Sequence, residues 1–203
     1  MRKLAAALAL AATLVVGAFA GTAAAAPTGG GCHLQGSASF NPGLNTSSKP
    51  FSYSFGGQLT GCASSDSSAP TSGSVEAGKV YTDATGQQFQ EPVSTGTGGC
   101  ANSTTSGTGI VTWADGTVTV VQYKTTGAAA AVELDGKVIP SVTLPAINPQ
   151  PGQPTSTTIN TTRYAGASAL GGLTFQPPDP TACNTPAGVS TAAIDGFIGL
   201  ASQ

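Results

Sequence analysis

The chain contains a single histidine, and this side chain is the first to consider for catalysis because imidazole titrates near neutral pH. His33 follows Cys32 at the start of a predicted strand. A serine hydrolase would depend on this one imidazole as its base. The sequence has no G-x-S-x-G turn, since residues 166–170 fail that pattern at the last position. We interpret His33 as a polar residue at a strand end, and the sequence predicts no catalytic residue and no enzymatic activity.

Paired carboxylates are the other arrangement that could act without histidine, as in glycosidases. Glu133 and Asp135 lie two residues apart and therefore on one face of a strand. Asp135 precedes Gly136, however, and Asp-Gly is typical of tight turns. We interpret Asp135 as a turn residue and Glu133 as a solvent-facing one. No metal or cofactor is expected, because one histidine with disulfide-bonded cysteines cannot build a zinc site and no calcium-loop pattern occurs.

Trp113 and Tyr123 are the candidate aromatic residues for ligand binding. They flank one predicted hairpin and could face each other across it, which would suit stacking against a sugar ring. The alternative, which we favour, is that both belong to the hydrophobic core.

The first 25 residues have the three parts of a secretory signal peptide: a basic head, an apolar run and small residues before a cleavage site. Cleavage is expected between Ala25 and Ala26, because a cut after Ala26 would place Pro27 directly behind the scissile bond. The alanine-rich leader favours a bacterial source. No lipid-attachment or sorting motif follows it, so the sequence predicts a secreted, extracellular protein with no membrane association once the leader is removed.

Four cysteines in an exported chain predict two disulfides and no metal site. Cys32 and Cys62 are equidistant from the turn-like residues 41–48, so they should face each other across a hairpin. This favours the pairs Cys32–Cys62 and Cys100–Cys183. The rival arrangement, which joins Cys62 to Cys100 and Cys32 to Cys183, stays open.

The charges of the chain are few and nearly balanced, with 7 Lys and Arg, 9 Asp and Glu and a formal net charge of −2. They are scattered along the sequence and form no basic cluster. Nucleic acids and anionic membranes are therefore poor partners, since both require clustered Lys and Arg. The expected partner is an unknown extracellular protein, a glycan or a small ligand, and the protein is expected to be a monomer.

Strand-like alternation of apolar and polar residues dominates the rest of the sequence, and no helical period is sustained. It is clearest over residues 34–40 and 51–55, with a predicted β-bulge at Gly56-Gly57. The dipeptides Asp115-Gly116 and Asp135-Gly136, each between β-rich runs, predict two tight hairpins.

Two proline-rich segments interrupt the strands, and the first, residues 140–154, is expected to be a stiff crossover that does not join a sheet. A bridge between Cys100 and Cys183 would span it. We therefore predict one domain over residues 26–203. About ten short strands predict an all-β fold, an antiparallel β-sandwich of the Ig-like or Greek-key type, with a β-barrel as the alternative.

Several scaffold motifs together resemble a group of uncharacterised small secreted β-rich proteins of actinobacteria. They are Cys32 with its alternating strand, Gly61-Cys62, Gly99-Cys100, residues 113–117 and the segment from Cys183 to Val189. The resemblance implies secretion and a β fold but transfers no functional residue. The composition is also similar to that of the chromophore-binding apoproteins of enediyne antibiotics, which are shorter exported β-sandwiches with two disulfides.

Taken together, the sequence predicts a non-catalytic extracellular binding or interaction domain. A carrier of a small apolar ligand is the alternative, followed by a carbohydrate-binding protein or a secreted hydrolase.

Overall fold

Thirteen strands and one short 3-10 helix make up the part of the chain that the computed structural model describes, residues 29–201. The expected leader, residues 1–25, and its cleavage site at Ala25 and Ala26 lie outside this range. Within it, no helix is long and apolar enough to cross a membrane. The elements are β1 (Gly29–Leu44), β2 (Lys49–Ser64), β3 (Gly73–Ala77), β4 (Val80–Thr82), β5 (Gln88–Gln90), β6 (Ser94–Gly98), β7 (Asn102–Trp113), β8 (Val118–Ala128), β9 (Ala131–Ile139), β10 (Ser141–Pro145), β11 (Ser156–Asn160), β12 (Ser168–Gln176), η1 (Pro180–Asn184) and β13 (Val189–Ala201).

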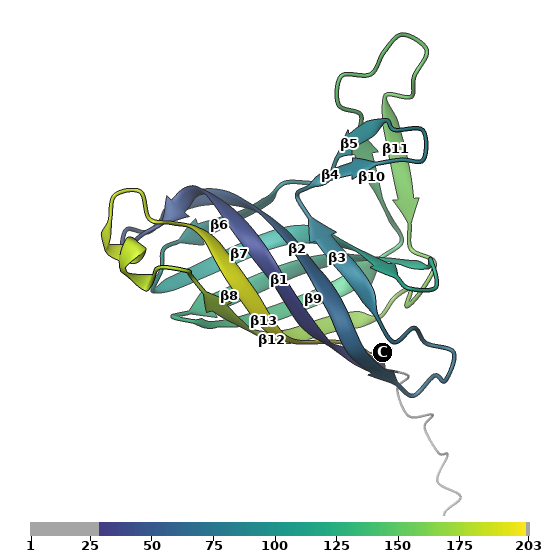
Figure 1. Ribbon diagram of the computed structural model, residues 1–203. Coiled ribbons are helices and arrows are strands. Elements are labelled where there is room, and N and C mark those ends of the chain that lie inside the picture. Colours follow the sequence, from purple (N-terminus) through teal and green to yellow (C-terminus); the bar gives the residue numbers. More distant parts are fainter. Residues whose placement is uncertain (1–28, 202–203) are drawn as a thin grey trace, which may run out of the picture.

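The largest sheet closes on itself, because β1 pairs with β2 along one edge and with β13 along the other. β3 and β6 occupy one position between β2 and β7, so the closed barrel has eight strands, all antiparallel to their neighbours (Figure 1). Around the barrel the strands follow their order in the chain. The predicted all-β class is confirmed. The sandwich and its Greek-key connections are wrong, and the barrel alternative is correct.

Long strands with glycine at inward positions explain why the sheet closes. β1 and β2 each run for 16 residues, and a Cβ at Gly36 would collide with the carbonyl oxygen of Gly56. Such close approach between strands, typical of a sharply curved barrel wall, is possible only with glycine. The pairing is regular through Gly56 and Gly57, so the bulge predicted there is wrong. The register shifts opposite Cys32 instead, where Gly61 has a φ of 57°.

The hairpin predicted at Asp115-Gly116 is present between β7 and β8, and the Asp115 carboxylate accepts a hydrogen bond of 2.9 Å from the Thr117 amide. The hairpin predicted at Asp135-Gly136 is wrong, because β9 runs straight through these residues. The chain turns earlier, at Ala129 with its φ of 51°. Gly136 is needed for space inside the barrel, where a Cβ would lie 2.7 Å from the Gln122 carbonyl oxygen.

A small lobe stands off one side of the barrel (Figure 1). It consists of the β4–β5 and β10–β11 hairpins, joined by a bridge between Phe89 and Ala146. Phe89 and Leu144 pack on Ile110, which is on the outward side of β7 yet only 7% exposed because the lobe covers it. Residues 141–145 of the expected crossover thus form a strand. Pro145 is tolerated because it ends a strand of a two-stranded sheet.

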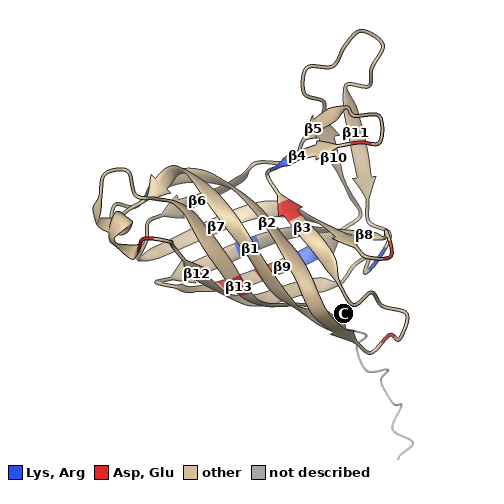
Figure 2. Cartoon of the chain, in the orientation of Figure 1, with Lys and Arg blue, Asp and Glu red and all other residues tan. Residues whose placement is uncertain are grey.

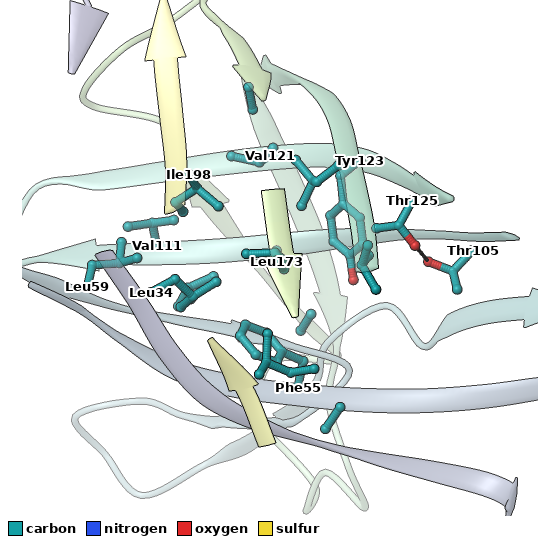
Figure 3. A pocket seen from close by; sticks show the side chains of 18 of the residues that line it. Leu34, Phe55, Leu59, Thr105, Val111, Val121, Tyr123, Thr125, Leu173 and Ile198 are labelled. Atoms are coloured by element: carbon teal, nitrogen blue, oxygen red, sulfur yellow. Dashed lines mark hydrogen bonds between the residues drawn. The ribbon is translucent and has the colours of Figure 1, made fainter. Parts of the chain in front are cut away.

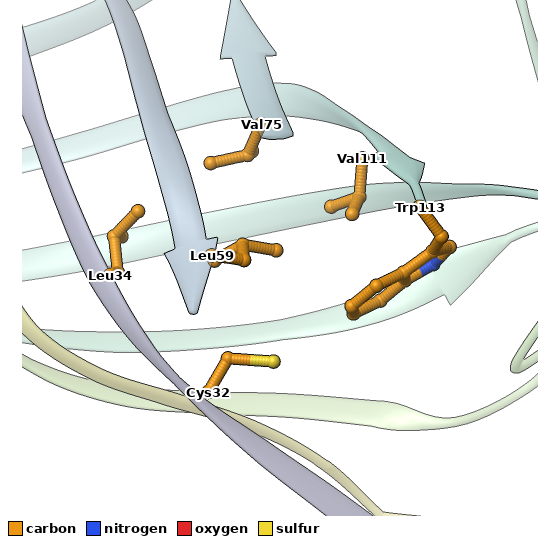
Figure 4. Packing of buried hydrophobic residues seen from close by; sticks show 6 residues of the cluster. All are labelled: Cys32, Leu34, Leu59, Val75, Val111 and Trp113. Carbon is orange, nitrogen blue, oxygen red and sulfur yellow. The ribbon is translucent and has the colours of Figure 1, made fainter. Parts of the chain in front are cut away.

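The two disulfides lie at opposite ends of the barrel. We call the end with Cys32–Cys62 the base and the end with Cys100–Cys183 the mouth. This is the pairing favoured by the sequence, and no free cysteine remains among residues 29–201. Above the base disulfide, Leu34, Leu59 and Trp113 belong to a cluster of buried side chains contributed by β1, β2, β3 and β7 (Figure 4).

Candidate ligand-binding cavity

The barrel encloses a cavity of about 170 Å³. Its walls are the inward-facing side chains of β1, β2, β3, β7, β8, β9, β12 and β13, and no Asp, Glu, Lys, Arg or His side chain within the described range lines it. Aliphatic side chains such as Leu34, Val121 and Ile198 reach into it from different strands (Figure 3). An eight-stranded barrel is just wide enough to be filled by side chains or to hold one small ligand. Here part of the interior is unfilled.

Aromatic rings line the cavity towards the mouth. The Phe40 ring lies 5.5 Å from that of Phe175, 6.0 Å from that of Phe51 and 6.1 Å from that of Tyr53, measured between centroids. Phe40 and Phe175 are half-buried, so part of their surface faces solvent. These rings therefore offer aromatic carbon to a molecule that enters through the mouth.

The base is closed by side chains that hold one another in place. The Trp113 ring meets the Tyr164 ring edge-on at 5.5 Å, and its indole N–H donates to Thr119. The Arg163 guanidinium lies 5.4 Å from the centre of the Tyr164 ring and forms ion pairs of 3.4 Å with Asp66 and with Asp115. These contacts join three loops across the base.

Five hydroxyl groups form a chain of hydrogen bonds on the inner wall. Thr125 bonds to Thr105 at 2.7 Å, Thr105 to Tyr53 at 3.0 Å, Tyr53 to Tyr123 at 2.8 Å and Tyr123 to Ser94 at 3.1 Å. All but Ser94 line the cavity. Figure 3 shows the Thr105–Thr125 bond beside the Tyr123 ring. These hydroxyls form a polar patch in an otherwise apolar cavity, an arrangement typical of small-molecule sites.

Burial favours the neutral form of the two tyrosines among these five hydroxyl groups. Burial raises the pKa of Tyr53, and raises the pKa of Tyr123 still further above its usual range, where the nearby Tyr53 and Glu91 add to the effect. Each phenol therefore keeps its proton at neutral pH. Gly107 makes room for the arrangement, because a Cβ there would collide with the Ser94 oxygen and lie 2.6 Å from the Tyr123 oxygen.

Glu91 is a buried acid next to this part of the wall, where the chain returns from the lobe to the barrel. It is 2% exposed, and its carboxylate accepts a hydrogen bond of 2.9 Å from the Lys79 amide. Its own amide donates to the Lys79 carbonyl oxygen at 3.0 Å. The two bonds join the two ends of the β4–β5 hairpin where it leaves the barrel. Burial raises the pKa of Glu91 above its ordinary value of 4.5.

This raised pKa predicts a pH-dependent effect of Glu91→Gln. The folded state binds the Glu91 proton more tightly than the unfolded chain does, so the wild type loses stability as the pH rises above about 4.5. Glutamine carries no charge at any pH and escapes that loss. The free energy of unfolding of Glu91→Gln, measured with urea, should therefore rise relative to the wild type between pH 4.5 and 7.5. Glu133→Gln, at an exposed position on β9, controls for the change in net charge. A difference between Glu91→Gln and wild type that stays constant over this range would contradict the prediction.

Trp113 and Tyr123 both line the cavity, at 5% and 9% exposure, so neither offers a surface platform for a sugar. The expectation that they face each other across the hairpin is wrong. Tyr123 is opposite Gly107 on β7, and Trp113 is opposite Gly73 on β3. Trp113 packs at the base, whereas Tyr123 belongs to the hydroxyl chain.

His33 lies on the outer wall of the barrel. Its Nε2 is 3.2 Å from the Asp195 carboxylate, which also accepts a hydrogen bond of 2.9 Å from Gln35, and its ring lies 5.1 Å from that of the exposed Phe197. The hydrogen bond from Gln35 has the larger effect and that from His33 the smaller, and both lower the pKa of Asp195. Within residues 29–201 no serine hydroxyl bonds to His33, and His33 does not line the cavity.

The two carboxylates considered for catalysis, Glu133 and Asp135, lie exposed on the outer face of β9, opposite Thr126 and Lys124 of β8. No group of three metal-binding side chains forms among the residues that the structure places. Charged side chains are sparse over the whole fold and gather into no extended patch of one sign (Figure 2).

The sequence does not predict the hydroxyl chain. The alternation around Tyr53 indicates only a strand, and Ser94, Thr105 and Thr125 lie in segments rich in serine and threonine, where nothing marks a particular hydroxyl. One signal for this site is present in β7. Among the residues of β7 that face the interior, Thr105 and Gly107 precede the apolar Val111. A glycine between polar and apolar inward positions indicates that a large side chain from another strand fills the space.

The chain matches no family model, no curated protein and no solved structure. The resemblance to secreted actinobacterial proteins therefore stays a prediction, and function has to be argued from the cavity itself.

Proposed function

We propose that this protein is an extracellular, non-catalytic carrier that holds one small apolar molecule inside its barrel. The observation that carries the proposal is the cavity of about 170 Å³ with an almost wholly apolar lining. Well-packed interiors have few voids larger than a water molecule. A void of this size costs stability through the contacts that its lining side chains lose, and a bound ligand would restore those contacts.

The size of the cavity defines the class of ligand. An apolar cavity of about 150 Å³ stays dry and binds benzene, whereas drug-sized ligands occupy pockets of about 300 Å³ or more. A cavity of about 170 Å³ therefore suits a single-ring molecule and is too small for a lipid or a polyketide chromophore. The apolar lining supports the same conclusion, because a sugar would leave its hydroxyls unpaired.

The arrangement of the two ends supports access through the mouth. The base is closed by the Trp113–Tyr164–Arg163 contacts, whereas the mouth presents the half-buried rings of Phe40 and Phe175. We place the protein outside the cell because of its leader-like first 25 residues and its two disulfides. The sparse charges support a small neutral partner rather than nucleic acid or an anionic membrane.

Filling the cavity should abolish binding. Gly109 lines it, and a Cβ built there would meet its nearest neighbours at 3.6 and 3.7 Å, which is ordinary contact. Gly109→Leu therefore adds a side chain to the space that the ligand would occupy. We expect the wild type to bind toluene, as observed by chemical-shift changes of inward-facing methyl groups in NMR titrations, and Gly109→Leu to show no such changes.

The matched control is Gly172→Leu, which places the same side chain on the outer face of β12, where a Cβ would meet nothing within 4 Å. This variant should bind toluene as the wild type does. If the wild type shows no saturable binding of toluene or of any other neutral single-ring compound, the carrier function is wrong.

A further inference from the structure

We propose that the ligand is a neutral single-ring alcohol or phenol, whose one hydroxyl group bonds to Thr125 at the cavity end of the hydroxyl chain. This inference rests on the proposed carrier function and names the chemical class of its ligand. It is carried by the geometry of the five hydrogen-bonded hydroxyls.

A count of protons shows that the chain of hydroxyls is incomplete. Each of its five members, Ser94, Tyr123, Tyr53, Thr105 and Thr125, has one O–H to donate. The four bonds between them use four of these donors. One donor therefore remains, and it is at one end of the chain when all bonds run in the same direction.

The two ends of the chain differ in their surroundings. Ser94 is fully buried and lies outside the cavity lining, whereas Thr125 lines the cavity. When the free donor is at Thr125, that hydroxyl can donate to a ligand oxygen. When it is at Ser94, Thr125 donates to Thr105 and its lone pairs can accept from the ligand. A ligand hydroxyl can satisfy both states, because it both donates and accepts, whereas an ether or a ketone satisfies only one.

The charge of the ligand follows from the rest of the lining. No described charged side chain lines the cavity, and an unpaired charge is very costly to bury in an apolar environment. Carboxylates and ammonium compounds of the same size are therefore excluded. A neutral hydroxyl loses its bonds to water on binding but regains one at Thr125.

The test compares phenol with toluene, which has the same shape but a methyl group in place of the hydroxyl. Thr125→Val replaces the terminal hydroxyl by a methyl group of similar size. We expect it to weaken phenol binding by about 2- to 10-fold, the effect of one net hydrogen bond, and not to weaken toluene binding. Thr125→Ser keeps the hydroxyl and should keep phenol affinity. Thr126→Val, at an exposed position on the same strand, should change neither affinity.

The outcomes separate this inference from the carrier function. If the wild type binds toluene but Thr125→Val changes phenol and toluene affinity equally, the ligand class is wrong and the carrier function stands. If neither compound binds the wild type, the carrier function itself fails. A crystal structure of the wild type with 4-bromophenol needs no variant: the bromine locates the ring, and a phenol oxygen beyond hydrogen-bond distance of Thr125 would also overturn the assignment.

Discussion

Replacing Cys100 and Cys183 together by serine is expected to lower the free energy of unfolding by about 4–5 kcal/mol, because the bridge closes a long loop in the unfolded chain. The two residues are 83 positions apart. The bridge also holds the loops at the mouth: the Cys100 amide donates to Asn45 at 2.8 Å, and the Cys183 carbonyl accepts from Thr46 at 3.1 Å. Without it, both segments lose their fixed position beside the β1–β2 turn. Urea denaturation of the double variant measures the loss.

The base disulfide provides the matched comparison. Cys32 and Cys62 are 30 positions apart, so the chain-entropy argument gives a smaller loss of about 3–4 kcal/mol for their double serine variant. Measured in the same buffer, the loss in the free energy of unfolding should therefore be larger for the variant without the mouth disulfide than for the variant without the base disulfide. The reverse order would show that loop length does not determine their contributions.

Trp113→Ala is expected to cost about 3–5 kcal/mol, the range for removing a large buried aromatic side chain. The ring is 5% exposed, packs against Tyr164 and bonds to the fully buried Thr119. Its removal leaves a cavity at the base and takes away the indole donor of the Thr119 hydroxyl, which keeps its bond to the Arg163 carbonyl oxygen. Thermal and urea unfolding both measure the effect.

The control for this variant is Leu170→Ala, which removes a large apolar side chain from the outer face of β12, where it is 57% exposed. Surface substitutions of this kind stay within about 0.5 kcal/mol. A loss from Trp113→Ala as small as that from Leu170→Ala would mean that the base is not closed by packing around Trp113.

The strands could be predicted from the sequence because side-chain alternation depends only on burial of one face. Leu34, Ala38 and Phe40 all face inward, as their spacing indicates. The same alternation is present in a sandwich and in a barrel, however, so it could not show that β1 pairs on both edges. That pairing connects Cys32 with Ile198, 166 residues later, and no local pattern reports contacts at such separation.

Glycine is the residue whose role is hardest to predict from this sequence. Asp135-Gly136 has the composition of a tight turn, yet Gly136 lies in a continuous strand. A glycine is needed there because Tyr123 occupies the space that a Cβ would fill. A turn and a close contact inside a barrel both require a residue without a Cβ, so the dipeptide alone cannot distinguish them. At Asp115-Gly116 the predicted hairpin is present, because Gly116 has a φ of 79° and the Asp115 carboxylate accepts a hydrogen bond from the Thr117 amide inside the turn.

The β-branched run after Asp115-Gly116 also indicates a layer outside the barrel. Thr119, Val120 and Val121 are all buried, although they alternate between the two faces of β8. Burial on both faces requires a second layer outside the barrel, which the lobe supplies. The candidate site was the least predictable part, because the hydroxyls of Thr105 and Thr125 acquire their roles only through contact across strands.

The division of one barrel position between β3 and β6 has a consequence for the dynamics of the wall. Ser106 pairs with β6 and Ile110 pairs with β3, but the three residues between them on β7 pair with neither. A segment with fewer ladder hydrogen bonds opens locally at a lower free energy than the whole fold. We therefore expect the wall to open locally at this point in its side, next to Tyr123, and such transient opening would give the interior a second route to solvent, independent of the mouth.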